Sequence, residues 1–204
     1  MMTERRSKPG SGRETETAGR AVPQQILRRV VALVGMMGSG KTAVGRALAS
    51  RLEVPFLDSD AAIEEAAQAS IAEIFSRDGE AFFRDREAEV IARLLSGPPA
   101  ILSTGGGAFM SERNRRAIST RGVSVWLEAD LDTLWERVRH KDSRPLLQTA
   151  NPRATLGEIL DRRGPIYALA DLHVRVDPRG SIDDTASRVI AALTNRPDVL
   201  GGAE

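Results

Sequence analysis

The stretch Gly35-Met36-Met37-Gly38-Ser39-Gly40-Lys41-Thr42 decides the fold of this chain. It fits the pattern G-x-x-x-x-G-K-[ST], in which glycines allow a tight loop whose backbone N–H groups point at a polyphosphate. An apolar run precedes it at residues 30–34, and apolar residues follow it at helical spacing: Val44, Ala47, Leu48 and Leu52. The loop is therefore predicted between a strand and a helix, whose positive N-terminal end faces the phosphates. An ordinary Gly-rich turn is the alternative interpretation.

Side chains within this loop are predicted to hold a nucleoside triphosphate. Lys41 is expected to reach the β- and γ-phosphates, and the hydroxyl of Thr42 is expected to ligate Mg²⁺. The other predicted nucleotide contacts are Gly38, Ser39, Gly40 and Ala43.

The composition narrows the class of function. The chain has 204 residues, enough for one domain with a substantial core, and a formal net charge of +1. This balance provides no basic field for nucleic acid or anionic membranes, so a small-molecule substrate is favoured. The absence of cysteine excludes disulfides and thiolate chemistry and is compatible with a reducing compartment. No apolar run could span a bilayer, so we expect a soluble protein. We further expect a cytoplasmic monomer that binds neither nucleic acid nor membrane.

The chain is predicted to consist of one domain between two tails. Residues 1–25 contain almost no large apolar side chains and are predicted to be a disordered tail. They lack the apolar stretch of a secretory signal, and their glutamates disfavour a transit peptide. Residues 26–195 are expected to form a single domain, and residues 196–204 a short frayed tail.

Within the domain, β-rich runs alternate with helical patterns, which is typical of a parallel sheet covered by helices on both faces. We therefore predict a three-layer α/β/α fold with a five-stranded parallel sheet. The expected strands are residues 30–34, 54–57, 100–103, 123–127 and 172–176. Capping boxes at Ser70 and Thr155 are predicted to begin helices, and Ser181 is predicted to begin the last one.

Asp58 and Asp60 lie at the end of the second predicted strand, and side chains two residues apart point to the same side. Ligands of open α/β sheets gather at the carboxyl ends of strands, so both carboxylates should face the phosphate loop. One can help to hold Mg²⁺ through water, and the other can accept a proton from an attacking hydroxyl. The alternative for Asp60 is an N-cap of the next helix. The third strand ends in Ser103-Thr104 rather than Asp, which disfavours the ordinary ATPase arrangement.

Two further segments carry candidate groups for binding an acceptor. Arg84 and Glu87 lie three residues apart on one helical face, either as a surface ion pair or as a guanidinium held for a substrate carboxylate. The run Gly105-Gly106-Gly107 follows the third strand and suits the close approach of a ligand to the backbone.

Residues 140–153 are polar and contain two prolines, and we predict that they form a mobile lid. Arg144 within this lid is expected to neutralise charge on the transferring phosphates, as an arginine finger does. Arg163 offers a second clamp for a carboxylate, although Arg162 and Arg163 could both be solvated.

Six segments, taken in order, resemble shikimate kinase, a P-loop family of the nucleoside-monophosphate-kinase structural group. The segments are GMMGSGKT, FLDSD, FFRDRE, STGGGA, SRPLL and DRRGPIY. The resemblance spans about residues 26–193, and six motifs in this order are highly specific. It implies transfer of the γ-phosphate of ATP to the 3-hydroxyl of shikimate with Mg²⁺, giving shikimate 3-phosphate and ADP. That reaction belongs to chorismate and aromatic amino acid biosynthesis.

The resemblance implies roles for individual residues on the nucleotide side. It places Lys41 and Thr42 on the ATP phosphates and the metal, with Asp58 near Mg²⁺. Arg144 would contact the phosphates. A contact to adenine is expected from Arg137, Arg139 or His140, with Arg139 favoured.

On the acceptor side, the resemblance implies a segment at about residues 58–90 that binds shikimate. Asp60 would contact the substrate hydroxyls and act as the base. Arg84, supported by Glu87, and Arg163 would bind the carboxylate. The backbone of Gly105, Gly106 and Gly107 would contact the substrate.

Two other classes of function compete with this interpretation. A gluconate or nucleoside monophosphate kinase of the same group would be expected to lack the combination of FFRDRE, GGG and the late arginine. A non-catalytic ATP-binding module would be expected to lose the acceptor groups, whereas Asp60, Arg84 and Arg163 are present. A GTPase would need a guanine-reading N-K-x-D element, and the sequence has none.

Overall fold

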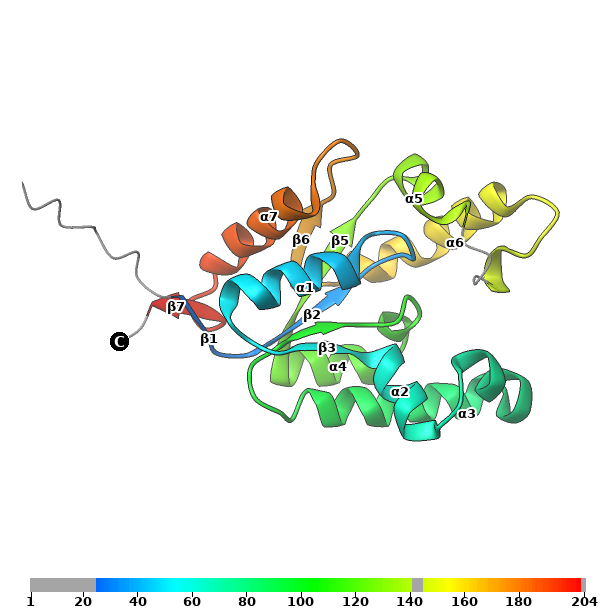
Figure 1. Cartoon of the computed structure of the whole chain (residues 1–204), viewed down its shortest axis with the longest axis horizontal. Coiled ribbons are helices and arrows are strands. Elements are labelled where there is room, and N and C mark those ends of the chain that lie inside the picture. Colours follow the sequence, from blue (N-terminus) through cyan, green and yellow to red (C-terminus); the bar gives the residue numbers. More distant parts are fainter. Residues whose placement is uncertain (1–24, 141–144, 203–204) are drawn as a thin grey trace, which may run out of the picture.

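The computed structural model describes residues 25–140 and 145–202. Five parallel strands form the central sheet in the order β3-β4-β2-β5-β6 (Figure 1). Their bounds are β2 Val30–Val34, β3 Phe56–Asp58, β4 Ile101–Ser103, β5 Gly122–Glu128 and β6 Leu172–Arg175. The predicted five-stranded parallel sheet is confirmed, with strand ends displaced by one or two residues.

Helices cover both faces of this sheet (Figure 1). Helices α1 (Lys41–Leu52) and α7 (Ile182–Thr194) lie side by side over one face, and α4 (Glu112–Arg121) covers the other with α3 (Ile71–Leu94) beside it. The other helical elements are α2 (Ser59–Ala67), η1 (Ala108–Met110), α5 (Leu131–Val138), η2 (Pro145–Leu147) and α6 (Pro152–Tyr167). The predicted three-layer α/β/α fold is confirmed. Within the described ranges, no helix combines the length and apolar character needed to cross a membrane.

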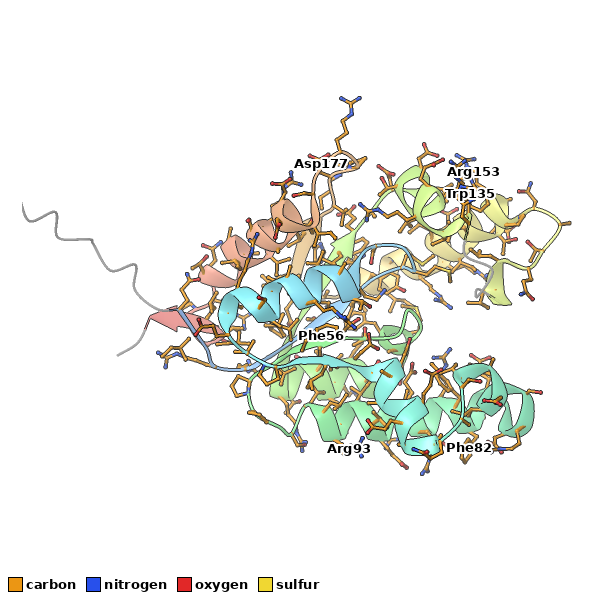
Figure 2. The ribbon with its side chains drawn as sticks, viewed as in Figure 1. Phe56, Phe82, Arg93, Trp135, Arg153 and Asp177 are labelled. Carbon is orange, nitrogen blue, oxygen red and sulfur yellow. The ribbon has the colours of Figure 1, made fainter. Side chains whose placement is uncertain are left out.

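Strand β2 lies at the centre of the core. All five of its residues are at most 2% exposed, because β4 and β5 flank it and helices cover both faces. Phe56 of β3 lies against α1 (Figure 2), where a Cβ on Gly45 would come within 2.7 Å of its ring. This close packing fixes α1, and therefore the loop that precedes it, over the carboxyl end of the central strand.

Capping explains where several helices begin. Ser70 and Glu73 form the predicted capping box of α3, and Ser181 forms one with Asp184 at the start of α7. The capping box predicted at Thr155 is wrong, because α6 already begins at Pro152. Asn151 is its N-cap and accepts from the N–H of Ala154, and proline suits the first helical turn because it needs no backbone donor there.

Residues near both ends of the domain form a second, two-stranded sheet. Strand β1 (Gln25–Leu27) pairs antiparallel with β7 (Leu200–Gly202), so residues 196–202 are not the frayed tail that the sequence predicted. Val199 and Leu200 are at most 1% exposed, and the N–H of Arg28 donates to the carbonyl of Val199 at 2.8 Å. A pairing between segments so distant in the chain leaves no local periodicity in either one.

The buried end of β7 gives a test of this pairing. We expect Leu200→Ala to lower the free energy of unfolding by about 2–5 kcal/mol, because it leaves a cavity in the core. Ile26→Ala, at a side chain 45% exposed on β1, should change it by less than about 1 kcal/mol. Urea denaturation of both variants measures the difference, and equal effects would contradict a structural role for β7.

Candidate active site

The phosphate loop connects β2 to α1, as the sequence predicted. Gly38 and Gly40 have φ angles of +84° and +97°, a backbone conformation that residues other than glycine rarely adopt. Helix α1 begins directly afterwards at Lys41. The buried Lys41 ammonium donates to the carbonyl oxygens of Gly35 at 2.9 Å and Met36 at 3.0 Å. Its charge is thereby held within the loop where a polyphosphate would bind.

Asp58 connects the phosphate loop to helix α2. Its Oδ2 accepts from the Thr42 hydroxyl at 3.4 Å, and Thr42 also lies 3.4 Å from the Ser103 hydroxyl. The other carboxylate oxygen accepts from the N–H groups of Asp60 and Ala61 and so caps α2. The cap of this helix is therefore Asp58, and the capping role considered for Asp60 is wrong.

The three consecutive glycines lie where the candidate acceptor groups meet. A Cβ on Gly105 would come within 2.5 Å of Asp60 Oδ1, and one on Gly107 within 2.8 Å of the Arg84 guanidinium. Between them, the Gly106 carbonyl accepts from Arg163 Nη1 at 3.2 Å. Asp60, Arg84 and Arg163 come from three different helices, and all of them reach this one loop.

Arg84 is fixed on several sides. Its guanidinium contacts Glu87 at 2.9 Å and Glu80 at 3.2 Å, and lies over the rings of Phe83 and Phe75 with centroid distances of 5.1 and 6.0 Å. The Glu87 side chain is 1% exposed, so the surface-pair interpretation is wrong. The pair instead holds a guanidinium in a defined position.

Burial and charge act against each other in this pair. Burial works to lower the pKa of Arg84, but Glu87 and Glu80 outweigh it and raise that pKa above its ordinary value. Burial raises the pKa of Glu87, and the attraction of Arg84 offsets only part of this effect. The guanidinium therefore stays charged, as the binding of an anion requires.

Helix α5 brings a further arginine to the phosphate loop. Arg137 Nη1 donates to the carbonyl of Gly38 at 3.3 Å and to that of Ser39 at 3.5 Å. Arg139, which the sequence favoured for adenine, pairs with Glu136 at 2.9 Å on the surface, and His140 is exposed. Arg137 is thus the one of the three that the structure places at the loop. Arg144 lies outside the described residues.

Sequence reasoning missed two hydroxyl groups that hold the glycine loop. The N–H of Gly105 donates to the Ser59 hydroxyl at 3.0 Å, and the Tyr167 hydroxyl donates to the Gly106 carbonyl. Both residues are fully buried, and burial raises the pKa of Tyr167 despite the opposing effect of Arg163. The position of Ser59 inside D-S-D and that of Tyr167 four residues after Arg163 were the available signals.

Taken together, the geometry defines a class of protein. A phosphate loop with a buried lysine lies beside a second site that holds two arginines and a carboxylate. Such a pair of sites suits the transfer of a phosphoryl group to a small acid that bears hydroxyls. The fold and this site are those of a P-loop kinase.

Comparison with known proteins identifies the family. A family model described as shikimate kinase matches residues 37–194. A shikimate kinase of Ruegeria pomeroyi is 67% identical over 174 residues, which are 85% of this chain and 89% of that relative. This chain belongs to the shikimate kinase family, so the resemblance of the six motifs is confirmed.

Solved structures agree with this assignment. A shikimate kinase from Acinetobacter baumannii in complex with shikimate has a TM-score of 0.78 and 38% identity, over 83% of this chain and 95% of that one. A gluconokinase from Sinorhizobium meliloti has a TM-score of 0.54 and 20% identity, over 82% of this chain and 93% of that one. The gluconokinase therefore shares the fold alone.

Gly107 offers a direct test of the acceptor side. Gly107→Ala should displace the Arg84 guanidinium and raise the KM for a carboxylated acceptor about tenfold, which corresponds to about 1.4 kcal/mol. The Kd for ADP should stay unchanged, because the phosphate loop is not touched. Gly157→Ala in α6, where the added Cβ makes only ordinary contact with Leu131, is the matched control. Equal KM values for the two variants would contradict this arrangement.

Proposed function

We propose that this chain transfers the γ-phosphate of ATP to the 3-hydroxyl of shikimate, giving shikimate 3-phosphate and ADP. Membership of the shikimate kinase family and 67% identity to a curated relative support this activity. The structural observation that carries the proposal is the approach of Asp60, Arg84 and Arg163 to one glycine loop beside the phosphate loop. Shikimate has a carboxylate for the arginines and hydroxyls for the aspartate.

On the acceptor side, Arg84 and Arg163 bind the carboxylate. Two guanidinium groups can each donate paired hydrogen bonds to it, and Glu87 keeps Arg84 in place for this contact. The backbone of Gly105, Gly106 and Gly107 forms one wall of the acceptor site, and the absence of side chains leaves room for the ring. Asp60 accepts hydrogen bonds from the ring hydroxyls.

On the nucleotide side, the phosphates bind to the N–H groups of the loop. Lys41 exchanges its contacts with the carbonyls of Gly35 and Met36 for contacts with the β- and γ-phosphates. The further contacts come from Gly38, Ser39, Gly40, Thr42 and Ala43, with the adenine near Arg137 or Arg139.

The residues present also fit Mg²⁺. Thr42 and Asp58 already contact one another, and a phosphate-bound Mg²⁺ needs only one or two such protein oxygens, with water and phosphate completing its shell. Bound there, the ion would neutralise charge on the β- and γ-phosphates. Asp58 holds its orientation because its other oxygen caps α2.

In the chemical step, the shikimate 3-hydroxyl oxygen forms a bond to the γ-phosphorus, and the bond between that phosphorus and the β,γ-bridging oxygen breaks. Asp60 accepts the hydroxyl proton, and the bridging oxygen leaves with ADP. Lys41 neutralises the growing negative charge, and we assign the same role to Arg144. Closure of residues 140–153 would exclude water, which otherwise competes as the acceptor.

The acceptor is tested by ADP release from the purified protein with ATP and Mg²⁺. We expect shikimate to stimulate ADP release strongly, and quinate, gluconate and nucleoside monophosphates to stimulate it far less. Quinate also carries a carboxylate, so a weak response to quinate would show that the enzyme recognises the ring and not the carboxylate alone. Absence of stimulation by shikimate would rule out the proposed activity, and stimulation by gluconate would favour the gluconate kinase alternative.

The role of Asp60 is tested by Asp60→Asn, which keeps the size of the side chain but removes the proton acceptor. We expect kcat to fall by about 10²–10⁴-fold while the Kd for ADP changes little. Asp161→Asn, at an exposed position of α6, is the control and should retain full activity. Wild-type turnover in Asp60→Asn would exclude Asp60 as the base.

A further inference from the structure

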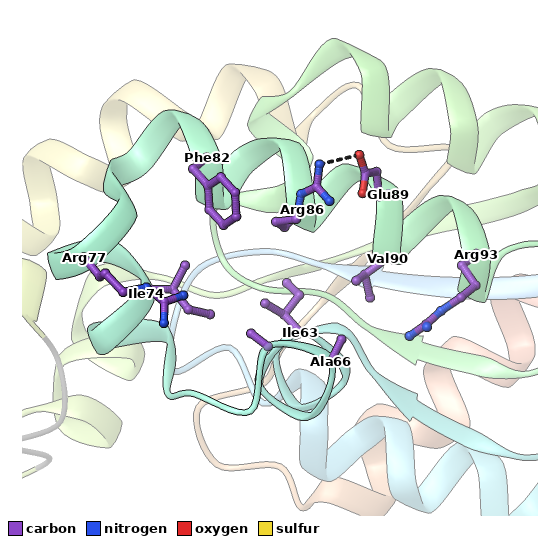
Figure 3. Close-up of a pocket in the computed structure, with 10 residues that line it drawn as sticks. Ile63, Ala66, Ile74, Arg77, Phe82, Arg86, Glu89, Val90 and Arg93 are labelled. Carbon is purple, nitrogen blue, oxygen red and sulfur yellow. Dashed lines mark hydrogen bonds and ion pairs between the residues drawn. The ribbon is translucent and has the colours of Figure 1, made fainter.

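A groove of about 420 Å³ lies between α2 and α3 (Figure 3), and no residue of the phosphate loop lines it. The lining residues of the second half of α3 share one helical face, whereas Arg84 lies on another. Residues that form the groove include Ile63, Ala66, Ile74, Phe82, Val90 and Arg93. None of these has a role in the activity proposed above.

The groove has an apolar floor. Ile63, Ile74 and Val90 are at most 8% exposed, and Phe82 is 43% exposed at one end. Ala66 of α2 lies opposite α3, and its small side chain leaves the space between the helices unfilled (Figure 3). An apolar or aromatic ring placed there would pack on this floor and remove the exposed surface of Phe82 from water.

The rim of the groove is cationic. Three arginines and one glutamate line it. Arg77 pairs with Asp78 at 2.7 Å and Arg86 pairs with Glu89 at 2.8 Å. Arg93 has no side-chain hydrogen bond or ion pair to any residue of the described ranges, and Figure 3 shows it pointing toward α2. The groove therefore has one unpaired positive charge at the end opposite Phe82 (Figure 2).

We propose that this groove binds a small organic anion with an aromatic or apolar ring. Its anionic group pairs with Arg93, and its ring packs on Ile63 toward Phe82. The N-terminal segment of the chain is a poor occupant, because residues 1–24 contain five basic and three acidic side chains and would be repelled by the rim. An external anion matches both the charge and the apolar floor.

A ligand bound in the groove would affect the acceptor site, because a short series of packed side chains connects the two. The floor residues Ile63, Ile74 and Val90 belong to the same hydrophobic cluster as Phe83. The ring of Phe83 lies 4.5 Å from that of Phe75, and the Arg84 guanidinium lies over Phe83. A ligand that changes the spacing of α2 and α3 would move Arg84 and change the KM for shikimate, a consequence that rests on the role proposed for Arg84.

Binding is tested with the fluorescent anion 8-anilinonaphthalene-1-sulfonate on the full chain, with ADP and shikimate saturating. We expect saturable binding at one site, at least fivefold weaker in Arg93→Gln and in Ala66→Leu, which fills the groove. Arg113→Gln, at an exposed arginine of α4, should bind like the wild type. The uncharged N-phenyl-1-naphthylamine should bind more weakly. An unchanged Kd in Arg93→Gln and Ala66→Leu would overturn the site. Purely competitive displacement of the probe by ADP or shikimate, in which the apparent Kd of the probe rises without limit, would also overturn it, because coupling between separate sites changes that Kd only by a fixed factor.

The coupling is measured separately, by the KM for shikimate at increasing probe concentration. We expect a change of at least threefold in the wild type and none in Ala66→Leu, whose kcat should match the wild type and show that it folds. Binding without any change in KM would overturn the coupling. Failure of the proposed activity would appear as absent ADP release and would leave the fluorescence titration intact.

Discussion

The hydrogen bonds of one glycine loop hold the two halves of the candidate active site together. Gly105 donates to Ser59 of α2, and Gly106 accepts from Arg163 and Tyr167 of α6. Backbone contacts of this kind need no side chain on the loop itself, so the loop can lie close to both helices and still leave space for a substrate. The relative position of Asp60 and Arg163 depends on it, because each belongs to one of the helices that the loop connects.

The central strand makes this arrangement possible. Because β2 is buried on both faces and flanked by β4 and β5, the phosphate loop, the D-S-D segment and the glycine loop all follow strands that end at one edge of the sheet. The positive end of α1 and the capped start of α2 lie at this edge as well. The sheet topology therefore brings the proposed phosphate, metal and acceptor groups together from three segments that lie far apart in the sequence.

Local patterns predicted most of the fold and the candidate groups, and non-local contacts explain what they missed. The run at residues 30–34 is apolar throughout, so its burial was evident, and the glycines before Lys41 have a known geometric purpose. Strand β7 has no such signal, because its partner β1 lies at the other end of the domain. Arg137 and Arg139 could not be separated by sequence, since only the packing of α5 decides which one faces Gly38.

The buried ion pair of Glu87 with Arg84 is costly to desolvate, and its position explains why it is kept. Burial raises its pKa, so the charged form is disfavoured where it lies, and a buried ion pair is weak support for stability because desolvation offsets much of the attraction. The contribution of Glu87 is to hold a neighbouring side chain in position. With Glu80 and two aromatic rings, it confines the Arg84 guanidinium beside Gly107, and a guanidinium already in place loses little conformational freedom when it binds a carboxylate. In the proposed function, the buried Glu87 therefore serves to position Arg84 for the carboxylate of the acceptor more than to stabilise the fold.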